Sequence, residues 1–292
     1  MGYQPKFKYR TLTGYFLQDE ASTDPGTFDY VSLPKKAASN FGLIPREQEE
    51  PSDDTQWERL GKDIGQLQNT AETKYKLLFL GRHGEGVHNV AERRYGTKAW
   101  DGHWSLLDGD EHGSWVDATL TDLGISQAQA AHASWEKQIA ERIPWPESYY
   151  VSPLRRCCQT AQITFEGLHT TETRIFRPMI KELLRETMGE HTCDRRSTLS
   201  EIAEENQKFS FEEGFVNEDV LWDTKTRESD QQRNERLTRF LDDIFTNDQN
   251  TSISLTTHSG AITSILEVIG HRKFPVATGG VLPVLVEANA IA

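Results

Sequence analysis

The 292-residue sequence has no long hydrophobic run, no basic run and only three cysteines. No stretch approaches the 18 consecutive apolar residues that read as a membrane-spanning helix, so we expect no membrane partner. Lys and Arg number 32 against 45 Asp and Glu, a formal net charge of −13. Because nucleic-acid binding relies on clustered Lys and Arg to displace counterions, we expect no nucleic-acid partner.

The few cysteines also exclude a disulfide framework. Cys157 and Cys158 are adjacent and Cys193 is remote, so at most one disulfide could form. A reducing compartment is the default for such a chain, and the first ten residues lack the apolar core of a secretory signal peptide. We therefore expect a cytoplasmic protein. No H-E-x-x-H or C-x-x-C spacing occurs, so we expect no metal and no cofactor.

Aromatic residues are plentiful, with 13 Phe, 8 Tyr and 7 Trp, which excludes a disordered chain. Residues 1–75 are polar and rich in turn residues, which predicts an irregular N-terminal extension. Residues 76–292 are expected to form a single domain. The extension should pack on this domain through four aromatic side chains, those of Phe16, Phe28, Tyr30 and Phe41.

Short apolar runs predict the strands of this domain, at 76–80, 149–151, 253–256 and 284–286. Helical patterns lie between them. One follows Thr121, a good N-cap residue, and others cover 237–245 and 261–269. Strands that alternate with helices predict an α/β fold with a mostly parallel central sheet and helices on both faces.

Residues 91–117 form an insertion between the first strand and the helix after Thr121. We predict no regular structure there, because aromatic residues stand among four glycines. Long loops in compact domains are usually functional, so we interpret the insertion as a lid, with Trp104 contacting substrate. Its aromatic residues suit an apolar or aromatic substrate body. The alternative is that these aromatics only anchor the N-terminal extension.

Cationic and imidazole side chains directly follow three predicted strands: Arg82 and His83, then Arg155 and Arg156, then His258. In an open α/β sheet, ligands bind in the crevice beyond the carboxyl ends of the strands. The helix N-termini that follow each loop add backbone donors and positive dipole ends. The pattern therefore predicts a phosphate-binding site.

These segments resemble the motifs of the histidine phosphatase superfamily, in the branch that contains the phosphoglycerate mutases, and the first resembles fungal phosphomutase-like proteins in particular. The motifs are R-H-G at 82–84, S-x-L-x-R-x-x-x-T at 152–160, L-x-E at 184–186 and T-H-S-G at 257–260. The resemblance implies a phosphoglycerate mutase-like fold. It also implies that His83 is the nucleophile and that Arg82 and Arg156 bind phosphate, whereas the neighbouring Arg155 does not.

The same resemblance implies that His258 is catalytic, that Asn89 lies on the phosphate side and that Glu186 is the acid. Glu182 and Glu190 are close alternatives for this acid. We expect burial near other acids to raise the pKa of Glu186, so that it protonates the leaving group and then activates water. From its own sequence context, His191 is a further candidate to line the site.

The resulting prediction is a phosphatase that hydrolyses a phosphate monoester or diphosphate of a small metabolite through a phosphohistidine. One alternative is a phosphomutase acting on phosphorylated sugar acids. An alternative of another class is a non-catalytic phosphate- or dinucleotide-binding module, since three glycines at 81, 84 and 86 follow a strand. Their spacing is the reverse of the dinucleotide fingerprint G-x-G-x-x-G. No pattern in the sequence predicts an oligomeric state.

Overall fold

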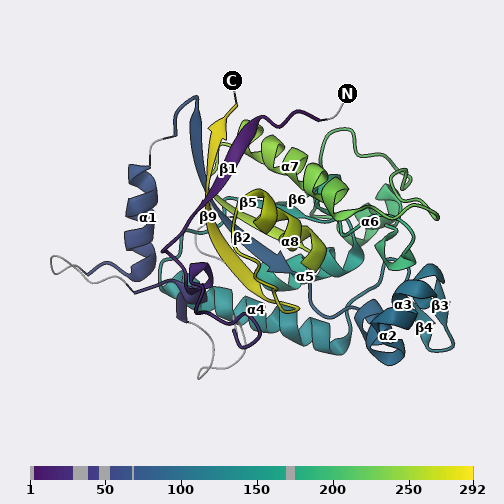
Figure 1. The fold of residues 1–292 in the computed structure, drawn as a ribbon. Helices are drawn as coiled ribbons and strands as arrows, with labels where there is room; N and C mark the ends of the chain where they lie inside the picture. The colour runs from purple at the N-terminus through teal and green to yellow at the C-terminus, as the bar shows by residue number, and fades with distance from the viewer. Residues whose placement is uncertain (1–2, 29–38, 46–52, 68, 169–174, 292) are drawn as a thin grey trace.

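The computed structural model describes residues 3–28, 39–45, 53–67, 69–168 and 175–291. Their central feature is a seven-stranded sheet in the order β1-β9-β2-β8-β5-β6-β7 (Figure 1). The strands are β1 (Phe7–Leu12), β2 (Thr73–Arg82), β5 (Ser148–Val151), β6 (Pro178–Ile180), β7 (Ser210–Phe211), β8 (Ser252–Thr257) and β9 (Val281–Ala290).

Most of this sheet is parallel, as the sequence predicts. Strands β2, β8, β5, β6 and β7 run in one direction. Strand β9 is antiparallel to β2, and β1 is antiparallel to β9. The four predicted strands correspond to β2, β5, β8 and β9, and the α/β fold is confirmed.

Helices cover both faces of the sheet, and the alternating side chains of β2 show how. Leu78 and Leu80 pack with residues of α7 (Asp230–Asn247) and α8 (Ser259–Val268), whereas Leu77 and Phe79 pack with residues of α1 (Gln56–Gln66) and α4 (Asp122–Ala140). Successive side chains of a strand point to opposite faces, so both faces of β2 are buried. Thr121 caps α4 by accepting a hydrogen bond from the Gly124 amide, which confirms that helix start.

The N-terminal part contains two regular elements that the sequence did not predict, β1 and α1. Of the aromatics expected to anchor it, Phe16 (0% exposed) and Phe41 (1%) are buried, and the partly buried Phe28 packs edge-on against Phe274. Tyr30 lies outside the described residues. Both elements join the main body, because β1 pairs with β9 and α1 buries Trp57 beside Phe79.

The insertion at 91–117 has regular structure, so the expectation of an irregular loop is wrong. It contains the end of α2 (Val87–Tyr95), α3 (Thr97–Gly102) and a hairpin of β3 (Gly109–Asp110) and β4 (Gly113–Ser114). Trp100 and Trp115 are buried in a small core with Cys193, and no described residue of the N-terminal part belongs to it. The aromatics therefore fold the insertion itself.

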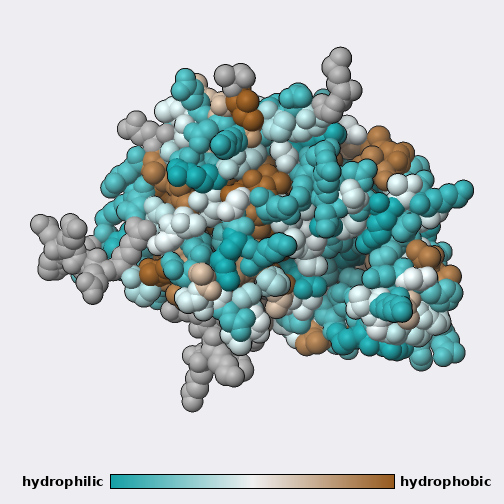
Figure 2. All heavy atoms as spheres, in the orientation of Figure 1, coloured by the Kyte–Doolittle hydropathy of each residue, from teal (hydrophilic) through white to brown (hydrophobic). Residues whose placement is uncertain are grey.

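Two further helices complete the fold, α5 (Arg155–Phe165) and α6 (Leu199–Glu205). Figure 2 shows a face that is mainly hydrophilic, with small apolar patches. Within the described ranges, the structure has no helix that is both long and apolar enough to span a membrane.

Candidate functional site

The parallel strands bring the three sequence motifs to one edge of the sheet. Arg82 is the last residue of β2, His258 follows β8 and Ser152 follows β5. The loops are tied to one another by backbone hydrogen bonds: the His83 amide donates to the Thr257 carbonyl at 3.0 Å, and the Ser152 amide donates to the Thr256 carbonyl at 3.0 Å. The expectation that these segments meet is thus realised in the structure.

His83 lies at the centre of this group and is only 2% exposed. Its Nδ1 lies 2.7 Å from the Gly84 carbonyl oxygen, which can only accept, so Nδ1 carries the hydrogen and Nε2 the lone pair. Burial holds the pKa of His83 well below its usual range, and the nearby Arg156 and Arg82 lower it further. The ring is therefore neutral at pH 7, with a free lone pair on Nε2.

His258 faces His83, with ring centroids 5.0 Å apart. It is fully buried, and its Nε2 lies 2.7 Å from the Ser152 hydroxyl oxygen and 3.3 Å from the Cys157 sulfur. Burial and the charge of Arg156 also hold its pKa well below the usual range. Ser152, the first residue of the second motif, thus positions the histidine of the last motif.

Thr160, the last residue of the second motif, binds the first one. Its hydroxyl accepts from the Gly84 amide at 3.0 Å and donates to the Arg156 carbonyl at 2.7 Å. Gly84 must be a glycine because a Cβ there would lie 2.4 Å from the Gly124 carbonyl oxygen. Gly84 therefore serves close packing on α4, which explains this glycine without a dinucleotide.

Arg156 is 1% exposed and points inward, whereas Arg155 points outward. The Arg156 guanidinium donates to the Cys193 carbonyl at 2.7 Å and to Asp194 Oδ1 at 2.8 Å, and its Nε is buried without a partner among the described residues. Arg155 instead forms an ion pair with Glu205 of α6 at 2.7 Å. Arg82 donates to the Val276 carbonyl at 3.0 Å, and its Nε is also buried and unpartnered there.

Glu186 reaches the loop that carries His258. Its Oε2 accepts from the Gly260 amide at 3.0 Å and its Oε1 from the Thr187 amide at 2.9 Å. A Cβ at Gly260 would lie 2.0 Å from Oε1, which explains the glycine of T-H-S-G. The alternative Glu182 binds Arg185 at 2.8 Å and Arg196 at 3.0 Å instead.

The expected rise in the pKa of Glu186 is wrong. Burial does raise this pKa, but the two backbone N–H donors and the charges of Arg233 and Arg156 outweigh burial, and the pKa lies below its usual value. Hydrogen bonds to the charged form of a carboxyl group favour ionisation. Glu186 is therefore a carboxylate at neutral pH.

The three remaining candidates, Asn89, His191 and Trp104, have separate contacts. The Asn89 side-chain oxygen accepts from the Gly86 amide at 3.0 Å, which leaves its NH₂ group to donate. His191 is 8% exposed, and burial and the charge of Arg227 lower its pKa to about 4. Trp104 is partly exposed and stacks on Tyr95, with ring centroids 3.9 Å apart.

The insertion docks on the segment that holds Arg156. The Thr192 hydroxyl donates to the Leu107 carbonyl at 2.6 Å, and the Trp100 ring lies 6.4 Å from that of His191. Cys193 packs in the core of the insertion while its carbonyl binds Arg156. The insertion therefore forms a wall beside the candidate site.

Sequence reasoning missed three side chains here, those of His88, Asp194 and Arg227. His88 lies 5.6 Å from His83 between ring centroids, and its place next to the R-H-G segment was an available signal. Asp194 and Arg227 follow no recognisable pattern, because they come from segments that meet only on folding.

His191, Cys193 and Asp194 have ligand atoms within 4.8 Å of one another, which is close enough to hold a metal ion. However, Asp194 already binds Arg156 at 2.8 Å and lies 3.5 Å from Arg227. Two guanidinium groups at the same carboxylate would repel a metal cation. The arrangement fits arginine positioning better than metal binding.

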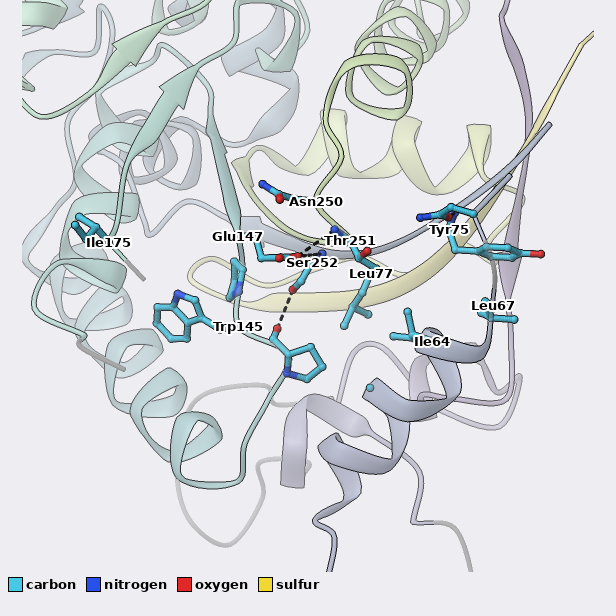
Figure 3. A pocket seen from close by; sticks show the side chains of 15 residues that line it. Ile64, Leu67, Tyr75, Leu77, Trp145, Glu147, Ile175, Asn250, Thr251 and Ser252 are labelled. Carbon is cyan, nitrogen blue, oxygen red and sulfur yellow. Dashed lines mark hydrogen bonds between the residues drawn. The ribbon is translucent and has the colours of Figure 1, made fainter. Parts of the chain in front are cut away.

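A cavity of about 660 Å³ lies at the other end of the strands (Figure 3). It is lined by α1 and by Ser252, the first residue of β8, whereas His258 follows the last residue of that strand. Among the described residues that line it, Glu147 is the only one with a charged side chain. Without a cation, this cavity does not suit a phosphate group.

Comparison with known proteins agrees with three of the four motifs, since the family match begins after R-H-G at 82–84. The model of the histidine phosphatase superfamily (branch 1) matches residues 102–277. The chain is 49% identical to "Probable phosphoglycerate mutase" of Arthroderma benhamiae, over 97% of this chain and 85% of the relative. It is 35% identical to "Phosphomutase-like protein 3" of Candida albicans, over 96% and 80%. Among solved structures, the ecdysone phosphate phosphatase of Bombix mori is 15% identical, with a TM-score of 0.43 over 74% of this chain and 92% of that chain.

Proposed function

Because this chain belongs to the histidine phosphatase superfamily, we propose that it hydrolyses phosphate monoesters of small organic molecules through a phosphohistidine at His83. The observation that carries the proposal is the state of the His83 ring. It is neutral, its Nδ1 is bound to the Gly84 carbonyl, and its Nε2 keeps the lone pair beside Arg82, Arg156 and His258. This is the arrangement that a nitrogen nucleophile toward phosphorus requires.

Arg82, Arg156 and His258 are proposed to bind the phosphoryl oxygens, with Asn89 as a further donor. Phosphoryl transfer depends mainly on positioning and on stabilising charge on the equatorial oxygens. Buried N–H groups rarely stay unpaired, and the Nε atoms of Arg82 and Arg156 are both buried without a partner in the described part of the chain. A bound phosphate would supply acceptors for them.

Glu186 is proposed to handle protons in both half-reactions. As a carboxylate it accepts a proton from the water that attacks the phosphohistidine. In the first half-reaction, an approaching phosphate dianion raises the pKa of this carboxyl group, because like charges disfavour ionisation. Glu186 can then take up a proton from solvent and pass it to the departing oxygen, which leaves the carboxylate that the second half-reaction uses.

A phosphomutase is the second candidate, favoured by the names of the two curated relatives. The phosphoenzyme is shared, and the difference lies in whether water or a substrate hydroxyl accepts the phosphoryl group. His191 and Trp104 are proposed to contact the organic part of the substrate, since Trp104 belongs to the insertion and His191 lies beside the insertion's Trp100. Trp100 and Trp115 are buried, so only Trp104 among these three tryptophans keeps surface for a ligand.

The test is a panel of p-nitrophenyl phosphate, alkyl phosphates, farnesyl phosphate and diphosphate, and 3-phosphoglycerate, scored for phosphate release and for isomerisation. Rapid quench with labelled substrate should trap acid-labile, base-stable phosphate on the parent enzyme. His83→Asn should abolish both trapping and turnover, while His132→Asn, which alters an α4 histidine bound to the Thr164 carbonyl, should change neither. Turnover by the His83 variant above about 1% of the parent rate would refute the nucleophile.

A further inference from the structure

His88 is a third histidine in the candidate site, beside His83 and His258. It is the second residue of α2 and is 9% exposed. Its ring lies 5.6 Å from that of His83, at an interplanar angle of 51°. His83 therefore has two imidazole neighbours, His88 and His258, both of them buried.

The two ring nitrogens of His88 lie in different surroundings. Nδ1 is fully buried, has no partner in the described structure and faces Gly86, where a Cβ would lie 2.6 Å away. Of the two ring nitrogens, only Nδ1 is both fully buried and without a partner among the described residues. An unpaired buried N–H is rarer in proteins than an unpaired buried acceptor, so the lone pair belongs on Nδ1 and the hydrogen on Nε2.

Charges around His88 favour an anion at this position. Burial lowers the pKa of His88 well below its usual range, and Arg156, His83 and Arg82 lower it further. His88 thus lies within the field of both arginines that face the nucleophile. A neutral ring there can donate one hydrogen bond without adding a further charge to an already cationic site.

We propose that His88 donates a hydrogen bond from Nε2 to a non-bridging oxygen of the phosphoryl group that His83 receives. This inference rests on the proposed function, because it needs His83 as the acceptor of that group. The donor would act beside Arg82 and Arg156, and it would stabilise the charge that develops on the equatorial oxygens during transfer. His88 is then a substrate-contacting residue.

The test compares His88→Phe, which keeps a ring but has no donor, with His88→Gln, which keeps an N–H donor. The probe is inorganic phosphate as a competitive inhibitor, together with the single-turnover rate of phosphoenzyme formation. His88→Phe should weaken phosphate inhibition and slow phosphorylation by about 10- to 100-fold, the range for a hydrogen bond to a charged group. His88→Gln should stay close to the parent, as should His132→Phe. The inference would be overturned if His88→Phe and His88→Gln changed phosphate inhibition and phosphorylation equally, or if His88→Phe changed neither.

A second measurement needs no variant to fold. In the parent protein labelled with ¹⁵N-histidine, inorganic phosphate should shift the His88 Nε2–H resonance, and the Nδ1 shift should be that of an unprotonated nitrogen. An unmoved resonance, or a proton on Nδ1, would refute the proposed donor. If the parent traps no phosphate on His83, the proposed function fails. If the parent does trap phosphate on His83 but His88→Phe binds inorganic phosphate normally, only the proposed role of His88 fails.

Discussion

Asp194 Oδ1 lies 2.8 Å from Arg156 Nη2, and both side chains are buried, with 4% and 1% of their surface exposed. The Cys193 carbonyl binds the same guanidinium at 2.7 Å. The pair joins the second sequence motif to the segment on which the insertion docks. Asp194 is thus a positioning residue for the guanidinium that is proposed to bind phosphate.

Breaking this pair should destabilise the fold strongly, because Arg156 would keep an uncompensated buried charge. We expect Asp194→Ala to lower the free energy of unfolding by about 3–5 kcal/mol, measured by urea denaturation. Glu205→Ala is the matched control, since it breaks the partly exposed pair with Arg155 and should cost about 1 kcal/mol or less. Similar losses for both variants would contradict the burial argument.

Replacing Arg156 by lysine should reduce kcat/KM by about 10- to 100-fold, because lysine keeps the charge but loses the planar fork that matches phosphate. Arg155→Lys should leave kcat/KM near the parent value, since Arg155 binds Glu205 instead. Steady-state kinetics with p-nitrophenyl phosphate measures both. A larger loss for the Arg155 variant would place the motif one residue out of register.

Glu186→Gln should slow hydrolysis of the phosphoenzyme, because an amide cannot accept the proton of the attacking water. Rapid quench should therefore reveal more labelled phosphoenzyme at steady state than in the parent. Alkyl phosphates should suffer more than p-nitrophenyl phosphate, whose leaving group departs without a proton. Equal losses on the two substrates with no accumulation would move the role to another residue.

The free energy of unfolding should decrease as the pH falls below 6.5, because of the buried histidines. The pKa values of His83, His88 and His258 lie well below 6.5 in the folded protein, whereas the unfolded chain binds these protons near pH 6.5. Acid then favours the unfolded state, by about 1.4 kcal/mol per histidine for each pH unit below 6.5. Urea unfolding of the parent and of His88→Gln between pH 7.5 and 5 measures the slope, and the variant should show a smaller one. Identical slopes would contradict the lowered pKa of His88.

Local patterns in the sequence were enough to predict the central part of the fold. Buried strands such as β2 and capped helices such as α4 can be recognised from short segments of the sequence. The order of motifs along the chain also placed His83, Arg156 and His258 at one edge, because parallel strands share their carboxyl ends. The L-x-E resemblance implied Glu186 as the acid, but only the structure shows that Glu182 is bound by Arg185 and Arg196 instead.

What the sequence could not predict depends on contacts between distant segments. The strand character of β1 needs its partner β9, nearly the whole chain away. The ordered insertion depends on burying Trp100 and Trp115 against Cys193. The direction of the Glu186 pKa shift depends on the backbone N–H groups of Gly260 and Thr187. Their positions relative to this carboxylate cannot be predicted from the amino-acid composition.

The pairing of β1 with β9 has a consequence for solubility. Six residue pairs from Phe7–Ala290 to Leu12–Leu285 occupy the outer side of β9, where unpaired backbone N–H and C=O groups would otherwise be a template for strand addition. The outermost strand on the opposite side, β7, has only two residues and offers little to a foreign strand. Removing residues 1–12 would leave residues 285–290 of β9 without a strand on that side. Such a truncated chain should associate edge to edge and aggregate, although every residue of the candidate site would still be present.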